Sequence, residues 1–188
     1  MKALLAAMLF AFCLLCPCAY AQQDEAARSR FLAREAKAKQ GDASAQLMLG
    51  DCYCLGEGVK KDYVEAGKWY RKAAEQGNAA AQWALGVSYS YGNGVAKDYV
   101  EAVKWYCKSA EQGESKAQCL LGICYAKGEG VAKDFVEAYA CWNLASATDK
   151  DAGKFRDDLE KKMSPQQVAD AQARTKELRA IVEAKAAK

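Results

Sequence analysis

Most of this chain consists of a tandem sequence repeat. Segment 77–112 carries the same residue as segment 41–76 at 23 of 36 positions without a gap, and segment 113–148 repeats the pattern more loosely. Such self-similarity is typical of proteins in which short units stack in a row, because one unit cannot bury its own apolar face. The repeat therefore predicts a stacked array of like units.

Each unit begins with a pattern of helix followed by turn. In the central unit, Ala81, Leu85 and Tyr89 recur every four residues, which is the spacing of one helix face. The segment 92–95, Gly-Asn-Gly-Val, then places glycine where a helix can end in the left-handed conformation at little steric cost. The same glycine pattern recurs at 56–59 and 128–131.

A second helix is predicted after each turn. Asp98, followed three residues later by Glu101, has the spacing of a capping box, in which both side chains accept backbone hydrogen bonds at a helix start. Asp62 and Asp134 occupy the equivalent places. The buried face of this helix is expected to carry Ala102, Trp105, Tyr106 and Ser109. The predicted class is all-α, built from helical hairpins.

The shared pattern is A-Q-x-x-L-G-x-x-Y-x-x-G-x-G-V-x-x-D-x-x-x-A-x-x-W-Y-x-K-A-A-x-Q-G. It resembles the Sel1-like repeat family, relatives of the tetratricopeptide solenoids, over residues 41–148. The resemblance implies a right-handed α-solenoid of antiparallel hairpins that serves as an adaptor for other proteins. The third unit departs at its end, where Thr148-Asp149 replaces Gln-Gly, and this change fits entry into a terminal cap.

The N-terminal segment of the chain predicts a signal peptide. Residues 1–21 combine Lys2, an apolar run and small residues at Ala19 and Ala21, so we expect a signal peptide cleaved after Ala21. A retained membrane anchor is disfavoured because the apolar run is shorter than the ~20 residues that a membrane span needs. A lipoprotein is disfavoured because the residues just before Cys16 and Cys18 are not the small residues that a lipoprotein signal needs. No later segment is apolar enough to cross a membrane, so the mature protein is expected in the periplasm or outside the cell.

Five further segments are predicted in the mature chain. The N-terminal capping helix is a degenerate half-repeat and spans residues 22–40. The three repeats span 41–76, 77–112 and 113–148, and the C-terminal capping helices span 149–188. The last helix is expected to start at Ser164-Pro165, with Gln167 completing the cap, and to run toward Ile181.

Composition argues against several classes of activity. The chain has no histidine, which excludes Ser-His-Asp and Cys-His catalysis. Without residues 1–21 the charge is 26 minus 24, or +2, with both signs mixed along every repeat, so nucleic acid is not an expected partner. No phosphate-binding or dinucleotide motif is present. We therefore expect no cofactor and no enzymatic activity.

Six cysteines remain after removal of the signal peptide, and their spacing does not match a zinc finger or ribbon. An even number of cysteines in an oxidising compartment suggests disulfides. The family resemblance also implies them, because a cysteine-rich branch of Sel1-like proteins joins the two helices of each pair by disulfide bonds. Helical phase favours a bridge between Cys124 and Cys141 over one between Cys107 and Cys119. Cys52 is expected to pack as an apolar residue and Cys54 to stay a free thiol in a monomer; the alternative is that Cys54 links two chains.

A binding surface is expected on the concave wall formed by the first helix of each repeat. Apolar side chains beside polar ones often mark such a surface. The candidates are Leu47, Met48, Asp51, Trp83, Val87, Tyr91 and Ile123. For Trp83 and Val87 the alternative is that they pack against neighbouring repeats.

These features favour an exported scaffold that binds a protein or peptide on its concave face. The alternatives are a β-lactam-binding or β-lactamase-like protein, as the cysteine-rich relatives imply, and a secreted effector. The Ser-x-x-Lys, Ser-Asp-Asn and Lys-Thr-Gly motifs of β-lactamases are absent.

Overall fold

The computed structural model describes residues 25–187, and within that range all regular secondary structure is helical. The predicted signal peptide lies outside the described residues. A helix over 25–39 is followed by α2 (Ala43–Leu55), α3 (Tyr63–Glu75), α4 (Ala79–Tyr91), α5 (Tyr99–Ala110), α6 (Ser115–Lys127), α7 (Phe135–Ala145), α8 (Lys150–Glu160) and α9 (Pro165–Ala186). None of these helices has the length and apolar character needed to cross a membrane.

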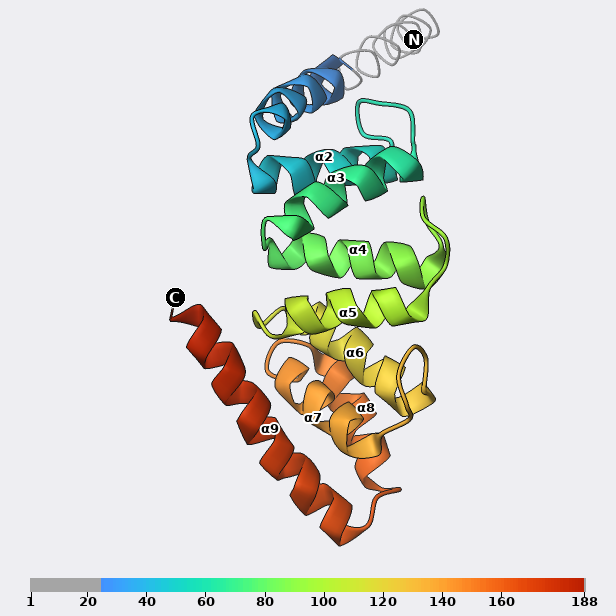
Figure 1. The fold of residues 1–188 in the computed structure, drawn as a ribbon, viewed down its shortest axis with the longest axis vertical. Coiled ribbons are helices and arrows are strands. Elements are labelled where there is room, and N and C mark those ends of the chain that lie inside the picture. The colour runs from blue at the N-terminus through green and yellow to red at the C-terminus, as the bar shows by residue number, and fades with distance from the viewer. Residues whose placement is uncertain (1–24, 188) are drawn as a thin grey trace, which may run out of the picture.

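The helices stack in chain order as a row of antiparallel pairs (Figure 1). The pairs are α2 with α3, α4 with α5, and α6 with α7, and each second helix packs on the first helix of the next pair. Buried side chains form successive clusters along the stack, centred on Leu49, Leu85, Tyr106 and Trp142. This arrangement confirms the predicted α-solenoid.

The predicted aspartate caps are present at the start of α3, α5 and α7. The Asp98 carboxylate accepts hydrogen bonds from the backbone N–H groups of Val100 and Glu101, and Asp62 and Asp134 do the same in their repeats. The second half of the expected capping box is not formed, because the glutamates have other partners. Glu65 and Glu101 pair with Lys68 and Lys104, three residues on, while Glu137 pairs with Arg174 of α9.

The second glycine of each turn is required for stacking. Gly94 has a φ of 74°, and a Cβ atom there would lie 1.9 Å from the backbone oxygen of Tyr63, the first residue of the preceding second helix. A Cβ atom on Gly130 would lie similarly close to the backbone oxygen of Tyr99, and one on Gly58 to that of Ala27. The helix of residues 25–39 therefore stacks on α2 as the second helix of a repeat would.

A buried glutamine joins consecutive repeats. Gln82, on α4, donates from Nε2 to the carbonyl of Ala74 at the end of α3, and its Oε1 accepts from Gln112 at the end of α5. Gln46 makes the same two bonds, to Ala38 and from Gln76. Gln118 repeats only the bond to Ala110, since Thr148 stands where the partner glutamine would be.

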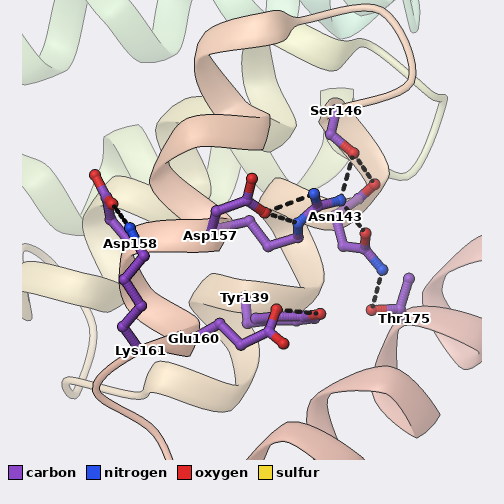
Figure 2. A network of polar contacts seen from close by, with 9 residues as sticks. Tyr139, Asn143, Ser146, Asp157, Asp158, Glu160, Lys161 and Thr175 are labelled. Atoms are coloured by element: carbon purple, nitrogen blue, oxygen red, sulfur yellow. Dashed lines mark hydrogen bonds and ion pairs between the residues drawn. The ribbon is translucent and has the colours of Figure 1, made fainter.

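The C-terminal helices close the stack by folding back on α7. The Ser164 capping box and the proline at the start of α9 are present as predicted, and α9 continues to Ala186. Asn143 of α7 accepts from Arg156 of α8 and donates to Thr175 of α9, while Tyr139 donates to Glu160 (Figure 2). Lys185, near the end of α9, reaches Glu111 at the end of α5. These contacts hold α9 across the side of repeats two and three (Figure 1).

Candidate partner-binding grooves

Two grooves lie between the first helices of consecutive repeats. Groove 1 has a volume of about 210 Å³ and lies between α2 and α4, with α3 contributing residues as well. Its lining residues are Asp51, Cys54, Leu55, Tyr63, Ala66, Tyr70, Trp83, Ala84, Val87, Ser88 and Asn93.

Groove 2 has a volume of about 300 Å³ and lies between α4 and α6, beside α5. It is lined by Ser90, Tyr91, Tyr99, Tyr106, Leu120, Ile123, Cys124, Lys127 and Glu129. Eight of these nine residues stand 36 positions after a residue of groove 1, for example Tyr91 after Leu55 and Glu129 after Asn93. The two grooves are therefore the same structural site in consecutive repeats.

A tyrosine is hydrogen-bonded inside each groove. In groove 1 the Tyr70 hydroxyl donates to Oδ1 of Asp51 at 2.8 Å, and burial followed by the Asp51 charge raises the pKa of Tyr70. In groove 2 the Tyr106 hydroxyl shares a 2.8 Å hydrogen bond with Oγ of Ser90, and burial raises the pKa of Tyr106. Both tyrosines therefore stay neutral at ordinary pH.

Five of the seven binding candidates line these grooves. Asp51, Trp83 and Val87 belong to groove 1, and Tyr91 and Ile123 belong to groove 2. The other two lie outside both grooves. Leu47 is half-buried against the core cluster that contains Leu85, and Met48 is 42% exposed. Both belong to α2, and no other first helix precedes it in the part of the chain that the structure describes.

Trp83 combines the two roles considered from the sequence. It lines groove 1 and also packs against the core clusters on both sides of α4, centred on Leu85 and Tyr106. Its indole nitrogen is buried and has no hydrogen-bond partner. Trp83 thus supports the wall of the groove, and its removal would disturb the core as well.

The equivalent position at the end of the solenoid has a different aromatic residue and a different neighbour. Trp142 occupies the repeat position of Tyr70 and Tyr106, and its ring lies 5.5 Å from that of Phe155 on α8, measured between centroids. The Trp142 Nε1 donates to the carbonyl of Cys119. The capping helix α8 therefore brings an aromatic side chain to the third position.

Residues from outside the first helices were missed by the sequence analysis. Tyr63 and Tyr70 come from α3, and Asn93 comes from the turn after α4. Leu55 was also missed, although it stands at the same repeat position as the predicted Tyr91. Comparison of the repeats position by position would have identified Leu55.

The six cysteines of the described range are unpaired thiols. Cys124 and Cys141 are buried in one cluster, with Cys107 packed against it, whereas Cys119 belongs to the next cluster. The predicted Cys124–Cys141 bridge thus concerns neighbouring side chains and stays a prediction. No group of three or more cysteine, aspartate or glutamate residues within 25–187 is arranged to hold a metal ion.

Comparison with known proteins identifies the repeat. The model of the Sel1 repeat matches residues 43–78, 79–114 and 115–147. A search of curated proteins gave no match.

Two solved structures are similar to this chain. One is c5321, a protective antigen present in uropathogenic Escherichia coli strains and displaying an SLR fold, with a TM-score of 0.76 and 38% identity over 83% of this chain. The other is a Sel1 repeat protein from Oxalobacter formigenes, with a TM-score of 0.59 and 44% identity over 60% of this chain. The alignments cover 34% and 47% of those two proteins. Since the three matched repeats span more than half of the sequence, this chain belongs to the Sel1 repeat family.

Proposed function

We propose that this chain is an exported scaffold that binds an extended segment of a partner protein across grooves 1 and 2. Sel1 repeats mediate protein interactions and are typically scaffolds without enzymatic activity. The observation that carries the proposal is the recurrence of one groove at matching positions of consecutive repeats. A repeated site suits a ligand that is itself periodic, as an extended peptide is.

The dimensions of the fold agree with such a ligand. Helices in contact lie about 8–10 Å apart, so equivalent grooves in consecutive hairpins are separated by no more than about 20 Å. An extended chain covers that distance with about six residues. One short segment is therefore long enough to place a side chain in each groove.

The groove margins carry exposed apolar side chains. Leu55 at groove 1 is 65% exposed, and Tyr91 at the same repeat position in groove 2 is 70% exposed. Contact with a partner would remove this apolar surface from water, which is favourable by about 25 cal/mol per Å². Tyrosine is also enriched among residues that dominate binding energy.

Export is proposed from the sequence of residues 1–21, which has the charge, apolar run and cleavage motif of a signal peptide. Mass spectrometry of the protein recovered from an expressing bacterium tests this part. A mature N-terminus at Gln22 is expected, and an intact Met1 would contradict it.

The binding proposal is tested by selection from a random-peptide display library on immobilised residues 22–188. The test variant is Leu55→Lys/Tyr91→Lys, because Lys127 stands at the same position of the third repeat and shows that lysine fits this helix end. Peptides selected on the unmodified protein should bind the variant at least about tenfold more weakly, which corresponds to 1.4 kcal/mol.

The matched control is Leu32→Lys/Ala169→Lys. It adds the same two charges at exposed positions on the helix of residues 25–39 and on α9, away from both grooves. Both variants should keep the circular dichroism spectrum and melting temperature of the unmodified protein. A library that yields no binding peptide, or equal weakening by the two variants, would contradict the proposal.

A further inference from the structure

The two grooves differ in charge at matching positions. Asp51 lines groove 1, whereas the same repeat position in the second unit holds Val87. Groove 2 carries Glu129 where groove 1 has Asn93, and Lys127 lies 3.9 Å from this carboxylate. The charges of groove 2 therefore compensate each other within the chain.

The Asp51 carboxylate has no such compensation. Within residues 25–187 it forms an ion pair with no lysine or arginine. The hydrogen bond to Cys52 is the largest cause that raises the pKa of Arg34, and the Asp51 charge comes after that of Glu57. The Nη1 atom of Arg34 lies 3.0 Å from Sγ of Cys52 and 3.7 Å from Glu57, so it is engaged elsewhere.

Covering groove 1 would change the surroundings of this charge. Asp51 is exposed to water and accepts one hydrogen bond from protein, from Tyr70. An ionised carboxylate can accept about four, so most of its capacity is met by solvent. A partner that displaces this water without supplying donors leaves a desolvated charge, which is costly. Lysine or arginine supplies both the donors and the opposite charge.

The aromatic walls contribute packing and do not select the charge. Lys61 already lies over the Tyr63 ring at 4.6 Å, and Lys116 over the Trp83 ring at 4.9 Å. The carboxylate is therefore the group that distinguishes a cation from a neutral side chain. The apolar walls fit the aliphatic stem that carries the charged end of a lysine or arginine.

We infer that groove 1 takes an arginine or lysine side chain of the partner segment, and that groove 2 takes an apolar side chain of the same segment. This inference rests on the proposed peptide-binding function and adds the chemical class of the ligand. It assigns Asp51 as the residue that determines specificity in groove 1.

The test repeats the library selection with Asp51→Asn in parallel. This variant removes the charge and keeps an oxygen to accept from Tyr70. Peptides selected on the unmodified protein should be enriched in arginine or lysine at one position, with an apolar residue about six positions away. Selection on Asp51→Asn should retain the apolar preference and lose the basic one.

Affinities of one selected peptide then isolate the contact. Asp51→Asn should weaken its binding at least about tenfold, as expected for a hydrogen-bonded charge pair. Replacing the peptide's basic residue by an uncharged one, citrulline for arginine or norleucine for lysine, should weaken binding to the same extent. The two changes together should cost little more than either alone, because they remove one shared interaction.

A second variant guards against a local disturbance by asparagine. Asp51→Val introduces the residue that the second repeat carries at this position, and it should also abolish the basic preference. Peptides that need Leu55 and Tyr91 but carry no basic residue would overturn this inference and leave the proposed function standing. Independent, additive effects of the two changes would also overturn it. No binding peptide at all would overturn both.

Discussion

The ring of Tyr106 lies directly against the backbone of Gly86, so that a Cβ atom on Gly86 would stand 2.6 Å from two ring carbons. Tyr106 is 1% exposed, and its hydroxyl is held in a hydrogen bond with Ser90. Gly50 meets Tyr70 and Gly122 meets Trp142 in the same way. This contact sets how closely the two helices of each hairpin approach, and it fixes the tyrosines that line the grooves.

Gly86→Ala should therefore destabilise the protein. Overpacking a buried site costs about 1–3 kcal/mol, while replacing a mid-helix glycine by alanine returns about 0.5–1 kcal/mol. We expect a net loss of about 1–2 kcal/mol in the free energy of unfolding, measured by urea denaturation.

Gly67→Ala is the matched control. Gly67 is also buried in a helix, but its nearest neighbour for a new Cβ atom is Val95 at 3.7 Å, an ordinary contact. This variant should be neutral or up to about 1 kcal/mol more stable. Equal effects at the two glycines would show that the Tyr106 contact does not limit helix approach.

Gln82→Leu should weaken the junction between the first and second repeats. Gln82 is 5% exposed, and leucine of similar size would remove both of its buried hydrogen bonds. The Ala74 carbonyl would keep its bond from Gly77, and the Gln112 amide would keep its longer bond to Lys108. Loss of such buried bonds costs about 1–3 kcal/mol. Gln166→Leu, which removes an exposed bond to Asp170, should change the unfolding free energy by less than about 0.5 kcal/mol. A similar loss in both variants would argue against a special role for the buried glutamine.

Much of this fold could be predicted because its signals are local and repeated. The glycine turns, the aspartate caps and the start of α9 at Ser164 depend on a few neighbouring residues, and each is present. The partner of Glu137 depends instead on where α9 packs. Its ion pair with Arg174 joins residues far apart in sequence, so the local capping pattern gave the wrong partner.

The groove residues were predicted only in part for a related reason. A helical-phase argument finds the first-helix positions, such as Asp51 and Val87, but it does not show which second-helix residues lie beside them. Tyr63 and Tyr70 enter groove 1 through hairpin packing. Met48 has suitable phase, yet each groove lies between the first helices of two consecutive repeats, and within residues 25–187 no first helix precedes α2.

Alkaline pH should destabilise the reduced protein through its buried thiols. Burial, with a smaller effect of nearby carboxylates, raises the pKa of Cys107, Cys119 and Cys124 to about 11 in each case. An unfolded cysteine ionises near pH 8.5. The contribution of these thiols to stability is therefore fully present below about pH 8.5 and is lost as the pH rises toward about 11.

The urea midpoint under reducing conditions should accordingly fall between about pH 8.5 and about pH 10, below the range in which the buried tyrosines add to the effect. Cys107→Ala/Cys124→Ala should show a shallower fall over this range, whatever its stability at neutral pH. An identical slope in the double variant would assign the alkaline effect to other groups.

In an oxidising compartment, where we propose that this protein resides, Cys124 and Cys141 should form a disulfide. Both thiols are buried in one cluster between α6 and α7, and an oxidising compartment favours their pairing. Closing a loop of this length stabilises by about 3 kcal/mol in the chain-entropy model. Peptide mapping of secreted material without reduction should recover the joined peptides, and reduction should lower the melting temperature. Cys107 packs against the same cluster but is not a partner in the predicted bridge. Cys107→Ser should therefore leave the bridge intact. Recovery of Cys107 joined to Cys124, or of three free thiols, would show that helical phase selects the wrong pair.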